Sequence, residues 1–267
     1  MIKVRLKFYK TGSLKFIGHL DVMRYFQKAI RRSELPVSYS KGYSPHQLIS
    51  FAAPLGVGNT SDAEYMDMQL DESVELEWIK IRLNQTMSSD MQIVSIKQLA
   101  DESKTSMSLL AAADYLVSWK DGYAYPPDFA NQFSMFVNQS SILVTKKTKK
   151  SEQEIDLKCY IYYHAFEQTV FEEKIGHTFF KTQAQVCENG NKVYLQLTCG
   201  SVYNIKPDFV MEEFCKYIGF EYNPYAYQIH RMELYTDINA PKGEANLNGS
   251  KTIRKLVALD QLGENHE

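Results

Sequence analysis

Hydrophobic and polar residues alternate strictly over residues 2–9. The apolar positions are Ile2, Val4, Leu6 and Phe8, and the polar positions between them are Lys3, Arg5, Lys7 and Tyr9. A period of two residues predicts a strand with one buried face. From about residue 19 to residue 34 the apolar spacing is helical. Pro36 ends this helix, because proline disfavours helical backbone at the residue before it.

The pattern then predicts the remaining elements of a first structural unit. They are a short strand at 49–51, a strand at 65–70, a helix at 74–87 and a strand at 91–97. The order β-α-β-β-α-β is that of a ferredoxin-like unit. The sequence therefore predicts one such unit within residues 1–100.

The second half of the chain repeats this order. We expect a strand at 115–119, a helix opened by Pro126-Pro127, a hairpin at 141–147 and 154–158, strands at 177–187 and 192–199, a helix at 207–218, and a strand at 226–235. The turn between the strands at 177–187 and 192–199 contains Asn189-Gly190, a strong hairpin signal. Gly219 suits the end of the last helix.

The fold class predicted is α+β, with two tandem ferredoxin-like (β-α-β-β-α-β) halves and antiparallel sheets. Residues 1–100 form the first domain, with a basic N-terminal βα unit and the Tyr39–His46 loop. Residues 111–237 form the second, with an insertion near 148–176, and the polar stretch at 100–110 is the boundary. Residues 238–267 resemble a linker, with one short helix at 251–261.

The composition of the chain is that of an ordinary globular protein. Its 267 residues are 44% hydrophobic and 23% charged, so it can bury a core without disulfides or metals. No apolar run approaches the roughly 18 residues that a membrane span needs. The alternating N-terminus is unlike a signal peptide. We therefore expect a cytoplasmic protein with no membrane partner.

The residues of common cofactor and catalytic motifs are missing. The four cysteines, at 159, 187, 199 and 215, form no Cys-x-x-Cys pair, so no iron–sulfur cradle is predicted. The six histidines are too widely spread for a local metal site. No nucleotide-binding glycine motif or nucleophile elbow occurs. We expect no metal and no cofactor in this chain, and binding is favoured over catalysis.

Charge is unevenly distributed along the chain. The net charge is only −2, but residues 1–50 hold ten Lys or Arg against two acids, and residues 51–110 hold ten acids against four bases. A basic block of this kind attracts phosphate. The alternative is that the two blocks neutralise each other in the folded protein.

The polar face of the first strand is one candidate binding surface. Lys3, Arg5 and Lys7 lie opposite the apolar positions, and Tyr65 lies on the corresponding face of the strand at 65–70. Cations beside an aromatic ring on an open sheet suit single-stranded RNA, because charge follows the phosphates and rings stack on bases. The alternative is that this face packs against the second half, with Asp67 paired to a Lys or Arg.

Residues 16–65 hold the other candidates. The possible catalytic residues are His19, Asp21 and His46, and the possible anion or RNA ligands are Arg24, Arg31, Arg32, Ser40 and Tyr43. Imidazoles beside a carboxylate and arginines are suited to acid–base chemistry or to anion binding. The alternative is a solvated helix face, since an Asp21–Arg24 pair contributes only a few tenths of a kcal/mol.

Several sequence blocks resemble the radical SAM-linked proteins, an uncharacterised bacterial family. They are Phe16-Ile17-Gly18-His19-Leu20-Asp21, Ala29-Ile30-Arg31-Arg32, Tyr39 to His46, Ser50-Phe51-Ala52, Pro54 to Val57, Glu64-Tyr65, Thr145-Lys146-Lys147, Ile155 to Lys158, Lys206-Pro207 and Ile229-His230-Arg231. The resemblance covers about residues 1–237. It departs at Gln47, where the family usually has proline, and at Lys158, where arginine is common.

The resemblance implies an accessory protein for a radical SAM enzyme encoded nearby, with RNA as a plausible substrate. Two alternatives stay open: a metal-free RNA endonuclease using His19 or His46, and a protein-interaction subunit that binds no nucleic acid. The first hypothesis depends on one spatial expectation. The cations of residues 3–32 and the loop that ends at His46 should line a common hollow.

Overall fold

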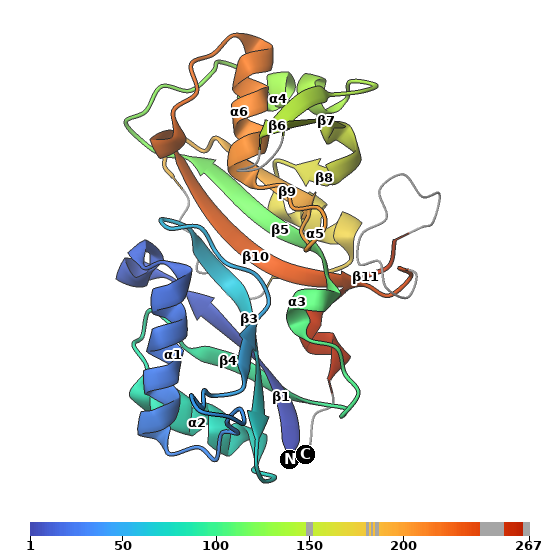
Figure 1. The fold of residues 1–267 in the computed structure, drawn as a ribbon. Helices are drawn as coiled ribbons and strands as arrows, with labels where there is room; N and C mark the ends of the chain where they lie inside the picture. The colour runs from blue at the N-terminus through green and yellow to red at the C-terminus, as the bar shows by residue number, and fades with distance from the viewer. Residues whose placement is uncertain (148–151, 180–181, 183, 185–186, 241–253, 264–267) are drawn as a thin grey trace.

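The computed structural model describes residues 1–147, 152–179, 182, 184, 187–240 and 254–263. Its main strands are β1 (Ile2–Lys10), β2 (Ile49–Phe51), β3 (Thr60–Leu70), β4 (Ile93–Leu99), β5 (Leu110–Trp119), β8 (Ile161–Ala165), β9 (Lys192–Thr198), β10 (Tyr227–Asp237) and β11 (Leu256–Ala258). All of these strands belong to one sheet (Figure 1). β6 (Leu143–Lys147) and β7 (Glu152–Asp156) form a separate hairpin.

The helices are α1 (His19–Ser33), α2 (Leu76–Thr86), α3 (Ser106–Leu109), α4 (Phe129–Val137), α5 (Gln168–Ile175) and α6 (Pro207–Ile218). Short 3₁₀ helices are η1 (Gly12–Phe16), η2 (Leu157–Tyr160), η3 (Pro224–Ala226) and η4 (Leu259–Leu262). The predicted α+β class is confirmed, with a mostly antiparallel sheet.

In the first half, β1 is the central strand. It pairs antiparallel with β3 on one side and β4 on the other, and β2 adds to the far side of β3. Val4, Leu6 and Phe8 are buried, as the alternation predicted, and pack with Phe26 and Ile30 of α1. α1 and α2 lie on one side of these strands (Figure 1). Lys3, Arg5 and Lys7, which alternate with these apolar residues, therefore face away from both helices.

In the second half, the strand order is β10-β5-β9-β8. Val117 and Leu195 face the core that Phe133 of α4 and Phe214 of α6 complete. Leu116, next to Val117, packs instead with Phe171 of α5 and with Tyr194. Because neighbouring strand residues point to opposite faces, α5 covers the face opposite to α4 and α6.

The two halves share the sheet through one parallel contact. β10 pairs with β3 at His230–Thr60 and Arg231–Ser61. We expected a separate antiparallel sheet in each half, and that expectation is wrong in this respect. β3 and β10 each have an edge that their own half leaves available, and the direct pairing satisfies the backbone groups of both.

Three predicted elements differ from the structure. The described residues within 177–187 form no strand, and β8, inside the expected insertion near 148–176, pairs with β9 instead. The predicted helix at 251–261 is β11 followed by η4 over its described residues, while 251–253 lie outside them. Residues 254–263 therefore return to the sheet instead of forming a linker. The expected boundary at 100–110 contains α3, which runs directly into β5.

Gly219 ends α6 in the left-handed conformation, with φ of 67°, and nothing lies within 4 Å of the position that a Cβ atom would take. Gly219→Ala is expected to lower the free energy of unfolding by about 1–2 kcal/mol, because the strain is in the backbone alone. Gly219→Asn should cost less, because asparagine tolerates this conformation better. Urea unfolding of both variants tests this, and equal losses would contradict it.

None of the helices within the described residues is long and apolar enough to cross a membrane.

Candidate functional site

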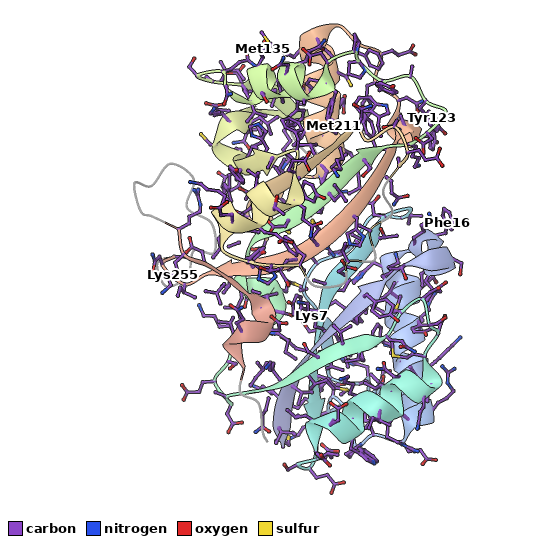
Figure 2. The ribbon with its side chains drawn as sticks, turned by 180° about the vertical axis from the view of Figure 1, so that it is seen from behind. Lys7, Phe16, Tyr123, Met135, Met211 and Lys255 are labelled. Carbon is purple, nitrogen blue, oxygen red and sulfur yellow. The ribbon has the colours of Figure 1, made fainter. Side chains whose placement is uncertain are left out.

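A cleft of about 980 Å³ lies on the face of the sheet that α1 and α2 leave open. That is at the upper end of the usual range for ligand pockets. Both halves line it. Its walls come from β1 and β4, from β3 and β10, from the segment after α5, and from η4 with the residue after it. Figure 2 shows Lys7, one of its lining residues, at the junction of the two halves.

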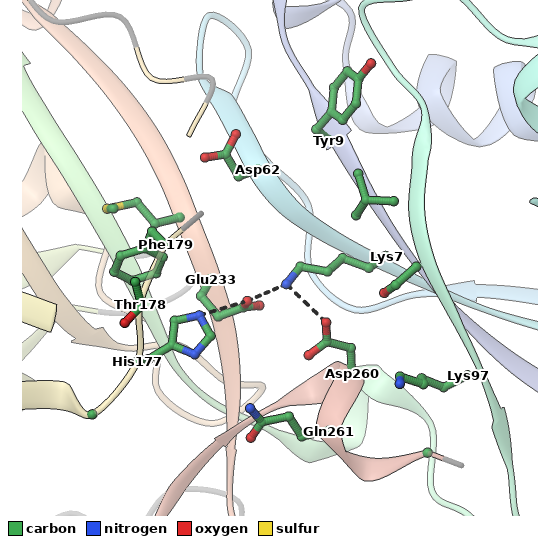
Figure 3. Close-up of a pocket in the computed structure, with 15 residues that line it drawn as sticks. Lys7, Tyr9, Asp62, Lys97, His177, Thr178, Phe179, Glu233, Asp260 and Gln261 are labelled. Carbon is green, nitrogen blue, oxygen red and sulfur yellow. Dashed lines mark hydrogen bonds and ion pairs between the residues drawn. The ribbon is translucent and has the colours of Figure 1, made fainter. Parts of the chain in front are cut away.

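An ion-pair network forms the floor of this open-face cleft (Figure 3). The Nζ atom of Lys7 is 2.6 Å from Oε2 of Glu233 and 3.2 Å from Oδ2 of Asp260. The hydroxyl of Tyr65 donates to Oε1 of Glu233 at 2.6 Å. Nε2 of His177 lies 3.7 Å from Oε2 of Glu233. The network thus connects a first-half lysine to the second half and to η4.

This network keeps its lysine charged. Burial alone would lower the pKa of Lys7, but the carboxylates of Glu233 and Asp260 outweigh it, and the pKa is raised. Burial, followed by the charge of Glu233, raises the pKa of Tyr65 well above its usual value. Lys7 is therefore an ammonium and Tyr65 a neutral phenol at neutral pH. Neither is poised to accept a proton from a ligand.

The ionic lining of the open-face cleft does not favour phosphate. Its ammonium groups are those of Lys7 and Lys97, and its carboxylates are those of Asp62, Glu233 and Asp260. Carboxylates are in excess, so a polyanion approaching this cleft meets net repulsion.

Two residues of the predicted RNA face, Arg5 and Tyr65, are not available to a ligand. Arg5 is 1% exposed, and its Nε lies 2.8 Å from Oδ1 of Asp67. Its guanidinium also donates to the carbonyls of Leu259 and Lys104. Tyr65 is buried, so its ring cannot stack on a base. For Arg5, the pairing with Asp67 that we stated as the alternative is the one observed.

His19 lies on the helix side of the sheet, away from the open-face cleft. Its ring meets Phe51 edge-on, with centroids 5.6 Å apart, and burial lowers its pKa. It borders a hollow of about 10 Å³, shared with Lys10 and Glu64, which has room for about one water molecule. His19, Glu64 and Arg231 all belong to segments that resemble the radical SAM-linked proteins. These segments pack together at the junction between the halves.

That junction contains a buried ion pair. Nε of Arg231 donates to Oε1 of Glu64 at 2.8 Å, and its NH2 group donates to Oε2 of the same carboxylate. Lys10 is 2% exposed and donates to the carbonyl of Ile17 at 3.0 Å. Burial lowers the pKa of Lys10, with Glu64 opposing this effect.

The predicted arginines of α1 lie on its outer side, together with Lys28. Arg24, Lys28, Arg31 and Arg32 are all exposed. Asp21 is exposed too, and its carboxylate is 3.3 Å from Arg24, a helix-surface pair of the weak kind that we gave as the alternative. Arg32 also donates to the carbonyl of Thr86 at 2.8 Å.

The Tyr39–His46 loop passes from α1 towards the open face. Gln47, which follows the loop, donates to the carbonyl of Gln27 in α1 at 3.5 Å. Tyr39 is 48% exposed and Tyr43 is fully exposed. Ser40 Oγ lies 2.8 Å from Nδ1 of His46 and accepts from the backbone N–H of His46 at 3.1 Å.

The predicted site residues therefore lie in several separate parts of the structure. His46 and Lys3 line one pocket, Lys7 lines the open-face cleft, and His19 borders the small hollow. Arg5 is buried, and the arginines of α1 are on the outer surface. The common hollow is not formed, because strand alternation turns Lys3, Arg5 and Lys7 away from the face that α1 covers.

Sequence reasoning missed the other groups of the open-face network. Glu233 was detectable, because it is a carboxylate within a strand rich in apolar residues. A carboxylate that is buried there needs a cation or a hydrogen-bond donor as its partner. His177 and Asp260 carried no local signal, since they reach the cleft only through the packing of the segment after α5 and of η4.

Residues 3–207 match a family described as an uncharacterized protein conserved in bacteria, DUF2344. No curated protein matches the chain with significance.

Proposed function

The chain belongs to the DUF2344 family of uncharacterized bacterial proteins, and from this premise we propose that it is an accessory protein that binds RNA for a separate radical SAM enzyme. The RNA-binding face consists of the outer side of α1 and the Tyr39–His46 loop. We call this the basic face. The cluster and the cofactor chemistry belong to the partner enzyme, and both proteins work in the cytoplasm.

One observation carries the RNA-binding proposal. Four exposed cations on α1 lie next to a loop with two exposed tyrosines, and the hydrogen bond from Gln47 to Gln27 joins the two segments. Arg24, Lys28 and Arg31 follow each other at helical spacing of four and three residues, so they share one side of the helix. Cations that track phosphates beside aromatic rings that stack on bases suit single-stranded RNA.

The partner is proposed from the resemblance to radical SAM-linked proteins. We also infer a ferredoxin-like unit in each half. This is supported by the orders β4-β1-β3, with β2 on β3, and β10-β5-β9-β8, which place the corresponding strands of the two halves in the same sequence. In this interpretation α5 is an addition to the second unit.

Salt-dependent RNA binding tests the proposal. A single-stranded dodecamer is titrated at several salt concentrations against the wild type and the triple variant Arg24→Gln, Lys28→Gln, Arg31→Gln. Each lost phosphate contact should reduce the slope of log K against log salt by about 0.7, so the triple variant should lose about 2. The control variant removes the same charge elsewhere, by Lys80→Gln, Lys174→Gln and Lys216→Gln. Equal slopes in the two variants, or no binding by the wild type, would refute the proposal.

An RNA cleavage assay and a co-purification assay with the wild type distinguish the two alternatives from this proposal. Shortening of a mixed RNA pool by the wild type, lost in His46→Ala or His19→Ala, would favour an endonuclease. Stable co-purification with the neighbouring radical SAM enzyme, together with no measurable RNA affinity, would favour a protein-interaction subunit.

A further inference from the structure

A pocket of about 260 Å³ lies where the Tyr39–His46 loop reaches the open face of β3. Its apolar lining comes from Leu48, Ile49, Met68 and Leu99. Its polar lining comes from Lys3, Ser50, Lys104 and Thr105, among others, and His46 borders it. The pocket is separate from the open-face cleft, with which it shares no lining residue.

Positive charges are in excess in this loop pocket, whereas negative charges are in excess in the open-face cleft. Lys3 and Lys104 each bring an ammonium group, and the one carboxylate is that of Asp67. Asp67 already accepts two hydrogen bonds from Arg5, at 2.8 and 3.2 Å, and one from the backbone N–H of Ser106 at 2.6 Å. Its charge is therefore matched by a buried guanidinium, and the lysines leave the pocket net positive.

The polar groups around the pocket can still serve a ligand. Lys3 Nζ donates to the carbonyl of Asp101, and an ammonium group has two further N–H donors. His46 is held through Nδ1 by Ser40, so Nε2 is the ring nitrogen that a ligand would meet. Lys104 is exposed at the rim.

We propose that the loop pocket holds one unpaired nucleotide of the bound RNA. Its base lies on the apolar lining, and its phosphate lies between Lys3 and Lys104. The volume accommodates a single nucleotide and excludes a duplex. The loop connects this pocket to the basic face, so an RNA strand on α1 can place one nucleotide in it. This inference rests on the proposed function and names the part of the RNA that the protein singles out.

Photocrosslinking and binding together test the assignment. A dodecamer with 4-thiouridine at successive positions is crosslinked to the wild type, and the crosslinked peptide is identified by mass spectrometry. We expect crosslinks at one RNA position to residues 46–50 or 103–105. Ser50→Phe, which fills the pocket without changing charge, should weaken dodecamer binding at least about fivefold, the loss expected when roughly 40 Å² of apolar base surface stays in water. Ser108→Phe, outside the pocket, is the matched control.

The charge of the pocket is tested separately. The double variant Lys3→Gln, Lys104→Gln should reduce the salt slope by about 0.7, the value for one phosphate. The four ribonucleoside monophosphates are titrated in parallel, and we expect each to bind much more weakly than the dodecamer. A mononucleotide that binds as tightly as the dodecamer would overturn the assignment to RNA and make the pocket a site for free nucleotides.

Two outcomes separate this inference from the proposed function. If the α1 variant weakens RNA binding while crosslinks avoid the pocket and Ser50→Phe binds normally, the inference fails and the proposed function stands. If the dodecamer does not bind the wild type, both fail.

Discussion

Glu64→Gln is expected to lower the free energy of unfolding by about 3–5 kcal/mol. Glu64 and Arg231 are 5% and 2% exposed, and they form two hydrogen bonds between β3 and β10. Without the carboxylate, the guanidinium of Arg231 stays buried with its charge uncompensated. The ammonium group of Lys10, also buried, loses its nearby anion. The loss is large because the penalty for burying both cations remains while the attraction disappears.

Urea unfolding of the wild type, Glu64→Gln and Asp21→Asn measures this effect. Asp21 is the matched control, because its pair with Arg24 is exposed and contributes at most a few tenths of a kcal/mol. The double variant Glu64→Met, Arg231→Met should recover part of the loss, since it removes the uncompensated guanidinium and keeps the volume, while Lys10 still lacks the anion of Glu64. Equal stability of Glu64→Gln and Asp21→Asn would show that the pair is not the electrostatic link between the halves.

Asp114→Asn is expected to make the protein more stable at pH 7.5, by up to about 5 kcal/mol. Asp114 is fully buried in β5, and Tyr235 donates to its Oδ2 at 2.6 Å. Burial raises the pKa of this carboxyl to about 8, with a further contribution from Glu233 and with hydrogen bonds from Tyr235 and Gln196 acting in the opposite direction. Asparagine has a similar shape and takes up no proton on folding, so the variant avoids the free-energy cost of protonating the carboxyl at this pH.

The sign of the pH dependence follows from this raised pKa. Between pH 4 and pH 8 the unfolded chain has lost the proton of Asp114, while the folded protein retains it. The folded state therefore binds more protons, and stability falls as the pH rises through this interval. Urea unfolding at pH 4.5 and 7.5 should show a steeper fall for the wild type than for Asp114→Asn. Parallel changes in the two proteins would contradict the raised pKa.

Most of the local structure could be predicted from periodicity. The alternation of Val4, Leu6 and Phe8 gave both the strand and its buried face, and Gly219 marked the end of α6. β8 was missed because Ile161–Ala165 lies in the segment that the repeated β-α-β-β-α-β order left over as an insertion near 148–176. The parallel contact of β3 with β10 was inaccessible to local reasoning, since it joins residues about 170 positions apart through backbone groups that any sequence supplies.

The candidate site was harder to predict, for an electrostatic reason. The sequence shows that Arg5 and Lys7 share a face, but only the folded chain shows which carboxylates neutralise them. For Lys7, both partners come from residues far along the chain, Glu233 and Asp260. Arg24, Arg31 and Arg32 of α1 were predicted as candidates, and they stay exposed in the folded chain, which is why the proposed basic face is built on them.

The return of residues 256–262 to β1 has a consequence for synthesis on the ribosome. The carbonyl of Leu259 accepts from Arg5, 254 residues earlier, and Asp260 meets Lys7. Because translation proceeds from the N-terminus, Arg5 can pair with Asp67 early, whereas the ammonium group of Lys7 stays solvated until Glu233 and Asp260 have been synthesised. The nascent protein therefore passes through a stage in which its first strand still displays the positive charge that the finished molecule conceals.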